Sequence, residues 1–378
     1  MVPTSKIFLI TYHLMYLPRQ IHNSLILWGS AGTLVDLGGV PVNYTVDEVI
    51  ISTRGTSTPM PGSIRTGNIE GSSVPVVNHH IIHPHNPITI MSLRAAVYIA
   101  PPVPFKNPGK GSGGGLWSPI SCTLIYSATH AVLVDTPITI AQTKELIAWI
   151  RRIAPNRALS YIYITHGHGD HFFGIPLLVQ EFPEAKPVAT AGTVQHMKQQ
   201  VEENVFRFQW DSRFPGEIQQ PFVLAEPLPR DNKFTLNQWE LQAVEVGHSD
   251  TYDSTVLWVP ALRLAVCGDV VYGQVHQMLM ETNTPAKRAE WIRAVEKVEA
   301  LDPLHVVPGH CQEGEILGRW HLDNTKEYIR AFEDVLKGNP KSARDVVGAM
   351  TKRYPDRFNV GAIILGAQAA VQAAQSRI

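Results

Sequence analysis

The sequence predicts an α/β protein in which two β-sheets pack face to face and helices cover their outer sides. Strand-like segments occur in two runs, and helix-like segments follow each run. This order favours a layered domain with a shared interior. Apolar residues make up 44% and charged residues 17% of the 378 residues, so the chain has enough apolar material for a large core.

The first ninety residues differ from the rest of the chain. They contain turn-rich tracts such as 57–62 and have poor hydrophobic periodicity. The pattern changes at Met91, and we therefore expect a single globular domain over 91–378. Residues 1–90 are then either a disordered extension or a mispredicted start of translation. We take the histidines of this stretch as solvated, because a metal site needs a preorganised ligand set; they are His79, His80, His83 and His85.

The first run of strands begins with the alternating, β-rich segment 94–100. The first helix is indicated by Leu146, Ile147 and Ile150 at helical spacing, and Pro155 ends it. The segments expected here are strands at 94–100, 121–127, 131–135, 161–164 and 186–190, and helices at 141–153, 175–181 and 191–205.

A long segment without clear periodicity, 206–230, separates the two runs. It holds several prolines, and we predict a loop there. The second run then leads into a helical C-terminal part. The segments expected are strands at 233–236, 240–246, 254–259, 263–267 and 304–307, and helices at 286–301, 313–336, 342–353 and 360–375.

Bulk composition excludes several classes of protein. The formal net charge is -1, and we find no basic stripe of the kind that binds nucleic acids. No run of eighteen apolar residues is present, so we expect no transmembrane helix. Three cysteines are too few for a disulfide framework and favour a reducing, cytoplasmic location. We expect a small-molecule substrate, no nucleic acid or membrane partner, and a homodimer as the candidate assembly.

The sharpest chemical pattern follows the apolar strand at 161–164. His166, His168, Asp170 and His171 occur within six residues. On an extended chain His166 and His168 point to the same side and can share one metal ion. Asp170 and His171 follow at a bend and can face a second ion about 3.5–4 Å away, as in two-metal hydrolytic sites.

Further metal-ligand candidates stand at the ends of three later strands. His248, Asp269 and His310 each follow an apolar run and a glycine. Rigid strands can deliver these side chains to one place, and the glycines leave room for them. The set contains imidazoles and carboxylates but no thiolate, which suits zinc, manganese or iron.

These residues resemble the metallo-β-lactamase superfamily. The family's His-x-His-x-Asp-His motif matches 166–171, its later ligands match His248, Asp269 and His310, and its early structural aspartate matches Asp135. The likeness covers about 95–318. It implies an αββα sandwich, the metallo-β-lactamase fold, with C-terminal helices and the metals at one edge.

The resemblance also implies how the ligands divide between two zinc ions, with iron or manganese as alternatives. His166, His168 and His248 would bind one ion, Asp269 would bridge, and the other ion would take Asp170, His171 and His310. A hydroxide shared by the two ions would attack a carbonyl carbon, and Asp170 would accept and pass on the proton.

The branch of the superfamily is indicated by residues around the last ligands. Tyr272 resembles a tyrosine with which the family's lactonases hold the substrate carbonyl, although a packing role is equally consistent. The family's β-lactamases with a thiolate ligand place a cysteine in the second metal site. Here Asp269 fills the bridging position, and Cys267 lies two residues earlier. We expect a dinuclear zinc hydrolase that opens a lactam or lactone of a small, partly apolar molecule. The alternatives are a thioester hydrolase of the glyoxalase II type and an iron-dependent oxidoreductase that resembles persulfide dioxygenases.

Aromatic residues near the motif predict an apolar pocket. Phe172 and Phe173 directly follow the motif, Trp117 follows the glycine-rich run 111–115, and Trp210 lies in the proline-rich segment. The glycine-rich run lacks the order of a phosphate-binding loop, and we predict a hairpin that overhangs the active site. We expect the lone His276 to be structural.

Overall fold

The computed structural model describes residues 34–35, 41–42, 92–107 and 114–376. The chain divides into two units, 1–45 and 46–378. In the first unit, strands β1 (Leu34–Val35) and β2 (Pro41–Val42) pair antiparallel. The expected extension over 1–90 lies almost wholly outside the described residues, as do the four histidines predicted to be solvated, so the proposed boundary near Met91 stays a prediction.

The second unit contains a six-stranded sheet in the order β10-β9-β8-β7-β6-β3. Strands β3, β6 and β7 pair antiparallel, and β7 to β10 run parallel. The strands are β3 (Arg94–Ala100), β6 (Ile120–Tyr126), β7 (His130–Val134), β8 (Ala158–Tyr163), β9 (Lys186–Ala189) and β10 (Glu226–Pro227).

A five-stranded sheet, in the order β11-β12-β13-β14-β15, packs against the first. Its first four strands pair antiparallel, and β14 and β15 run parallel. The strands are β11 (Lys233–Leu236), β12 (Trp239–Gly247), β13 (Ser254–Val259), β14 (Leu264–Val266) and β15 (His305–Val307).

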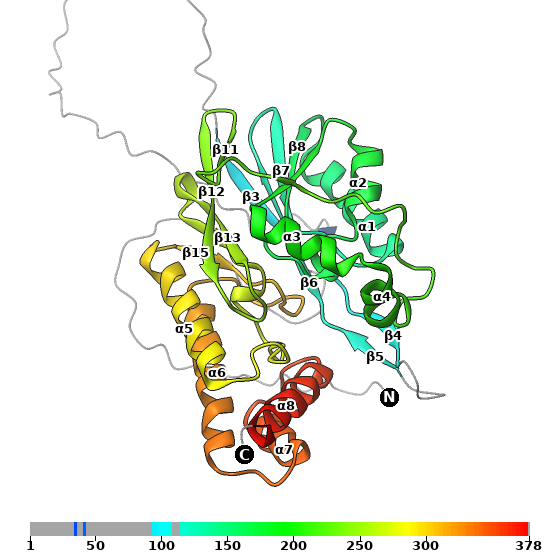
Figure 1. Cartoon of the computed structure of the whole chain (residues 1–378). Coiled ribbons are helices and arrows are strands. Elements are labelled where there is room, and N and C mark those ends of the chain that lie inside the picture. The colour runs from blue at the N-terminus through cyan, green and yellow to red at the C-terminus, as the bar shows by residue number, and fades with distance from the viewer. Residues whose placement is uncertain (1–33, 36–40, 43–91, 108–113, 377–378) are drawn as a thin grey trace, which may run out of the picture. The chain divides into compact units, whose positions relative to one another are not determined.

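The core has three apolar layers, and strand alternation explains them. In β7, Val132 and Val134 face the second sheet, while Leu133 between them packs with the helices outside the first sheet. Residues of β13 divide in the same way between the interior and the outer helices of the second sheet. Two sheets at the centre with helices on both outer sides are visible in Figure 1. The predicted αββα sandwich is therefore confirmed.

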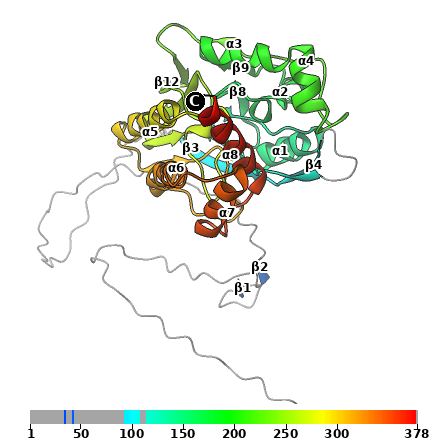
Figure 2. The same cartoon turned by 60° about the horizontal axis from the view of Figure 1, so that its bottom comes forward.

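The helices cover the two outer faces, and several have clear start signals. Helix α1 begins after Thr139, whose side chain and that of Gln142 form a capping box. Helices α7 and α8 lie next to each other at the C-terminal end of the fold (Figure 2). The helices are α1 (Ile140–Ile153), α2 (Ile175–Glu181), α3 (Ala191–Gln200), α4 (Glu203–Val205), α5 (Pro285–Ala300), α6 (Trp320–Lys337), α7 (Ala343–Arg353) and α8 (Val360–Gln375).

Three of the predicted segments differ from the structure. The helix expected over 191–205 is interrupted, because α3 ends at Gln200 and the short α4 begins at Glu203. The segment 206–230 is not a loop throughout: Phe206–Asp211 forms a π-helix, and β10 adds an edge strand. A π-turn does not follow the α-helical period, so periodicity could not detect it. The helix expected from Glu313 begins only at Trp320. Gly314 has a left-handed φ of +78°, which is incompatible with a right-handed helix at that residue.

The predicted glycine-rich hairpin is present as β4 (Val103–Lys106) and β5 (Gly114–Trp117), and its tip lies outside the described residues. Within the described ranges, no helix combines the length and the apolar character needed to cross a bilayer. Strands β7 and β8 run parallel to each other, and in the second sheet β12, β14 and β15 share one direction. Residues that follow strands of one direction can therefore meet at one edge.

Candidate metal centre

The sandwich edge gathers a buried cluster of imidazole and carboxylate groups. His166 and His168 follow β8, Asp170 and His171 lie in the short 3-10 turn Gly169–His171, and the others come from loops after β12, β14 and β15. The side chains form three groups, and within each group the donor atoms lie within 4.8 Å of one another. Together the groups involve seven residues: His166, His168, Asp170, His171, Asp250, Asp269 and His310.

One half of the cluster is built on the 3-10 turn. The Nε2 atoms of His171 and His310 lie 3.4 Å apart. They lie 3.2 and 3.3 Å from the two carboxylate oxygens of Asp269, respectively. The Oδ2 atom of Asp170 lies 4.0 Å from His171 Nε2 and 3.6 Å from His310 Nε2. Four donors thus converge on one small volume, with Asp269 facing both imidazoles.

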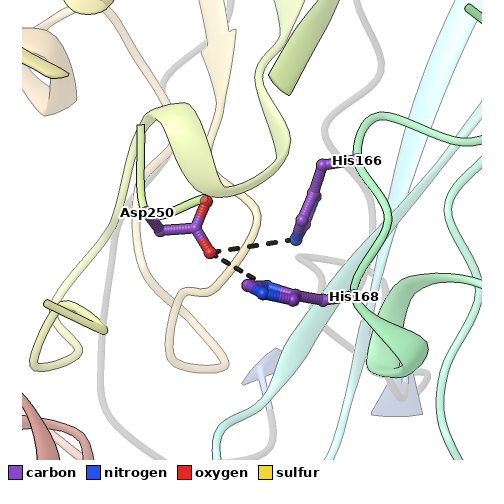
Figure 3. Close-up of side chains that lie close together, drawn as sticks. All are labelled: His166, His168 and Asp250. Atoms are coloured by element: carbon purple, nitrogen blue, oxygen red, sulfur yellow. Dashed lines mark ion pairs between the residues drawn. The ribbon is translucent and has the colours of Figure 1, made fainter. Parts of the chain in front are cut away.

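The other half contains His166, His168 and Asp250 (Figure 3). Asp250 Oδ2 lies 3.0 Å from His168 Nδ1 and 4.0 Å from His166 Nε2. The second nitrogen of His168, Nε2, lies 3.1 Å from Glu281 Oε1. His168 is therefore held between two carboxylates, with Nδ1 turned toward the cluster.

Outer contacts fix which nitrogen of each ring faces the cluster. His171 Nδ1 lies 3.0 Å from Asp135 Oδ2, and His310 Nδ1 lies 2.7 Å from the carbonyl oxygen of Pro119. His166 Nδ1 lies 3.1 Å from the hydroxyl of Thr165. Such partners hold the Nε2 atoms inward, as is usual for metal-binding histidines.

Asp135 connects this centre to the fold. Its carboxylate accepts hydrogen bonds from the backbone N–H and the hydroxyl of Thr165, at 2.9 and 2.8 Å. The same carboxylate orients His171, and Asp135 itself adopts a positive φ of 60° at the end of β7. One side chain therefore joins the ends of two parallel strands to a histidine of the cluster.

His248 does not join the cluster in this structure. None of the three donor groups includes it, although it belongs to the described residues. Its Nε2 atom lies 3.2 Å from Thr282 Oγ1. Asp250, two residues later, takes the place beside His166 and His168 in which the superfamily pattern led us to expect His248.

The donor set fits divalent metal ions. Three buried atoms that point into the cluster, His166 Nε2, Asp250 Oδ2 and Asp269 Oδ1, make no regular hydrogen bond in the described part of the chain. Their close contacts are ion pairs with other groups of the cluster. Unpaired buried polar atoms are costly. Two ligands about 2.1 Å from a tetrahedral ion lie about 3.4 Å apart, and most donor separations here are close to that value.

Electrostatics in the cluster point the same way. Burial opposes the protonation of His171, yet Asp269 and Asp170 outweigh it and raise the pKa of His171 well above its usual value. Burial likewise opposes ionisation of Asp269, but His310 and His171 hold the pKa of this carboxyl well below its usual value. Burial raises the pKa of Asp250 to about 6, against the effect of His168. Positive charge between the carboxylates therefore stabilises them, and a bound cation would supply it.

Two glycines leave the space that these groups occupy. A Cβ on Gly309 would lie 2.2 Å from Asp269 Oδ1, and one on Gly268 would lie 2.2 Å from Thr165 Oγ1. Gly268 also has a φ of +48°. The prediction that glycines clear room beside the strand-end residues is confirmed at both positions.

Tyr272 and Trp117 each bind a carboxylate of the cluster. The Tyr272 hydroxyl donates to Asp269 Oδ2 at 2.5 Å, and the Trp117 indole N–H donates to Asp170 Oδ2 at 2.9 Å. Burial raises the pKa of Tyr272 well above its usual value, and Asp269 adds to the effect. The phenol therefore stays a neutral donor.

A cavity of about 260 Å³ opens above the cluster, and five of its lining residues are His168, Asp170, Asp250, Asp269 and His310. The predicted aromatic walls are confirmed for Trp117 and Trp210. They are wrong for Phe172 and Phe173, which are buried in the core because the turn after the motif runs under the first sheet. His276 borders the cavity, and its Nδ1 lies 2.7 Å from the Tyr328 hydroxyl.

Sequence reasoning missed three contributions to the site. It did not assign a role to Asp250 or to Glu281, and it placed Trp117 in the wall without its hydrogen bond to Asp170. The signal that could have revealed Asp250 is its position two residues after His248, in the loop that follows β12. Nothing local marks Glu281, because a long loop brings it to His168.

The family model of the metallo-beta-lactamase superfamily matches residues 115–310. Over 209 residues the chain is 24% identical to the "Beta-lactamase-like protein 2 homolog" of Caenorhabditis elegans, a match that covers 54% of this chain and 59% of the nematode protein. The chain therefore spans about three fifths of that relative's length.

Two bacterial proteins are also similar. The "Metallo-beta-lactamase type 2" of Bacteroides fragilis is 22% identical over 222 residues, which cover 57% of this chain and 76% of the bacterial protein. A solved metallo-beta-lactamase structure from Pontibacter korlensis is 19% identical, covers 63% of this chain and 94% of its own, and has a TM-score of 0.43.

Replacing Gly268 with alanine should destabilise the domain strongly. The new Cβ meets both a left-handed backbone and the Thr165 hydroxyl, and together these should lower the free energy of unfolding by about 3 kcal/mol. Gly216 is a matched control, with a φ of +73° and no atom within 4 Å of the place that a Cβ would take. Its alanine variant should lose only about 1 kcal/mol in urea unfolding. Equal losses would contradict the proposed close approach.

Replacing Asp135 with asparagine should weaken metal binding while leaving every proposed ligand in place. The amide cannot both accept from Thr165 and orient His171 as a carboxylate does, so we expect zinc affinity to fall about 10- to 100-fold in chelator competition. Asp302→Asn, on an exposed carboxylate, serves as the control. The orienting role of Asp135 would be refuted by an affinity equal to that of the control.

Proposed function

The chain belongs to the metallo-beta-lactamase superfamily, and from this premise we propose that it is a metal-dependent hydrolase with two zinc ions. It opens a cyclic amide or ester, a lactam or lactone, of a small and partly apolar molecule. The observation that carries the proposal is the buried donor cluster at the floor of the 260 Å³ cavity, because a substrate in that cavity would contact the donors directly.

We assign His166 and His168 to the first ion, Asp170, His171 and His310 to the second, and Asp269 to the position between them. Two bound zinc ions would supply an activated water and polarise a carbonyl group. The spacing of the donors supports this division. Asp269 forms a group with one histidine of each ion, His166 and His171, as a bridging residue should. Asp170, His171 and His310 form another group, which would hold the second ion.

Asp170 has the position needed to handle the proton. The residue lines the cavity, and its Oδ2 atom accepts the indole N–H of Trp117. This hydrogen bond fixes the carboxylate. Asp170 would accept the proton of the attacking water and pass it to the leaving nitrogen or oxygen.

Tyr272 is the second residue that we place in the reaction. It lines the cavity, and its hydroxyl donates to Asp269 Oδ2. A substrate carbonyl would therefore compete with Asp269 for the same hydrogen. Tyr272 can bind the carbonyl only after it releases the carboxylate, which makes its contribution smaller than that of a preorganised donor.

The cavity walls support a partly apolar substrate. Trp117, Trp210, Met278 and Leu365 contribute apolar surface, and Phe208 stands at the cavity with 77% of its surface exposed. Arg213, the arginine of this wall, donates to the backbone carbonyls of Phe208 and Gln209. All three cysteines are free and buried, which supports a reducing, cytoplasmic compartment.

The proposed activity is tested with a substrate panel on protein of measured metal content. Zinc-loaded enzyme should open γ-lactones and lactams, and alkyl-substituted rings should react faster than unsubstituted ones because the walls are apolar. A glutathione thioester and glutathione persulfide represent the two alternative activities. If iron predominates in the native protein and the zinc-reloaded protein hydrolyses none of these substrates, the hydrolase proposal fails.

Asp170→Ala is the mechanistic control for that panel. It should bind the second ion more weakly and lose about two to four orders of magnitude in turnover, with little change in thermal unfolding. Full activity in this variant would refute a two-ion mechanism while leaving the substrate class open.

Tyr272→Phe should be a milder lesion. The ring would keep its packing against Trp291 and His310, but Asp269 and the substrate would lose the donor. We expect kcat on the best lactone to fall by up to about tenfold with zinc content unchanged, since one hydrogen bond to a neutral carbonyl contributes about 0.5–1.5 kcal/mol. Unchanged kinetics would reduce Tyr272 to a packing residue.

A further inference from the structure

The first metal ion needs a third protein ligand, and the chain offers two candidates two residues apart. We propose that Asp250, and not His248, completes the set begun by His166 and His168. This inference rests on the proposed two-ion function and names a carboxylate where the superfamily pattern led us to expect an imidazole.

The geometry of Asp250 is that of a ligand. Its carboxylate is buried, and Oδ1 accepts a hydrogen bond from the Ser249 hydroxyl at 3.1 Å. Oδ2 is left to face the two imidazoles at 3.0 and 4.0 Å (Figure 3). Among the residues that the structure describes, His166 Nε2 has no hydrogen-bond partner, and Asp250 Oδ2 has only its ion pairs with the two histidines. A shared cation would satisfy both atoms.

The hydrogen-bond pattern around His248 turns its imidazole away from that role. The Thr282 hydroxyl donates to the Ser249 carbonyl oxygen at 2.6 Å. Its oxygen is therefore the acceptor toward His248 Nε2, which must carry a hydrogen. An Nε2 that carries a hydrogen has no lone pair for a metal ion, so this nitrogen is not a ligand atom while it contacts Thr282. The other ring nitrogen, Nδ1, belongs to none of the three groups of donor atoms in the described part of the chain.

His248 lies beside the loop that leads into helix α5 and beside the first turns of that helix. Val244 and Val246 of β12 pack toward the apolar layer under helices α5 and α6. The charged groups that act on His248 are Lys287 and Glu290 of α5 and Glu281 of the preceding loop. The pairing register shifts between Glu245 and Gly247, and Gly247 has a φ of +94° that ends the strand. The following loop then turns Asp250 inward.

Glu281 reinforces the assignment. It contacts His168 Nε2 and accepts the hydroxyl of Thr251, the residue after Asp250, at 2.6 Å. The loop that carries Asp250 is therefore tied to the same histidine from its other side. A third carboxylate also lowers the charge of the ligand set by one unit relative to a neutral imidazole, so neutral esters and amides should be preferred to anionic ones.

The test compares Asp250→Asn with His248→Ala in zinc-loaded full-length protein. Metal content after dialysis and zinc affinity in chelator competition are the readouts, and thermal unfolding controls for folding. We expect Asp250→Asn to lose one equivalent of zinc, or to bind it at least ~100-fold more weakly, and His248→Ala to keep both. The opposite pattern would overturn the assignment and leave the proposed hydrolase intact.

A measurement on the unmodified chain keeps the assignment testable if a variant misfolds. In cobalt-substituted protein, each ligand histidine gives a paramagnetically shifted imidazole N–H signal. The assignment predicts shifted signals from His166, His168, His171 and His310, whereas a fifth signal would identify His248 as a ligand and overturn it. If the protein bound neither cobalt nor zinc, the proposed function and this assignment would both be refuted.

Discussion

The rest of the structure depends on one constraint: a cluster of imidazole and carboxylate groups is buried at the sandwich edge with atoms that make no regular hydrogen bond among the described residues. Such atoms destabilise a folded protein unless a ligand or ion satisfies them. The fold nevertheless secures the cluster. Asp135 at the end of β7 orients His171, the Pro119 carbonyl lies behind His310, and Gly309 leaves room for Asp269. The domain is therefore built to hold charge that its own side chains do not balance, and cation binding is the simplest reason.

Sandwich and site are coupled through strand direction. Parallel strands β7 and β8 bring Asp135 and the histidine motif to one edge, and the second sheet sends β12, β14 and β15 to it. Thr255 on β13 joins the halves, because its N–H and hydroxyl both donate to the Thr165 carbonyl. The cavity above that edge is lined by residues of strand β5, the π-helix and helix α8.

Much of this could be predicted from the sequence because the relevant signals are local. The alternating strands, the Thr139 cap and the dense motif at 166–171 each lie within a few neighbouring residues. The parts that failed are those that local patterns cannot reveal. The π-helix at 206–211 follows an uncommon period, and Phe172 and Phe173 turn into the core rather than the cavity. His248 follows a register shift and a left-handed glycine at the end of β12, which composition alone does not show.

A two-ion centre is tested most directly by X-ray diffraction from zinc-grown crystals, recorded on both sides of the zinc absorption edge. We predict two anomalous peaks at the sandwich edge. One should lie among His166, His168 and Asp250, the other among Asp170, His171 and His310, with Asp269 between them. A single peak, or density for zinc only elsewhere on the domain, would contradict a two-ion centre.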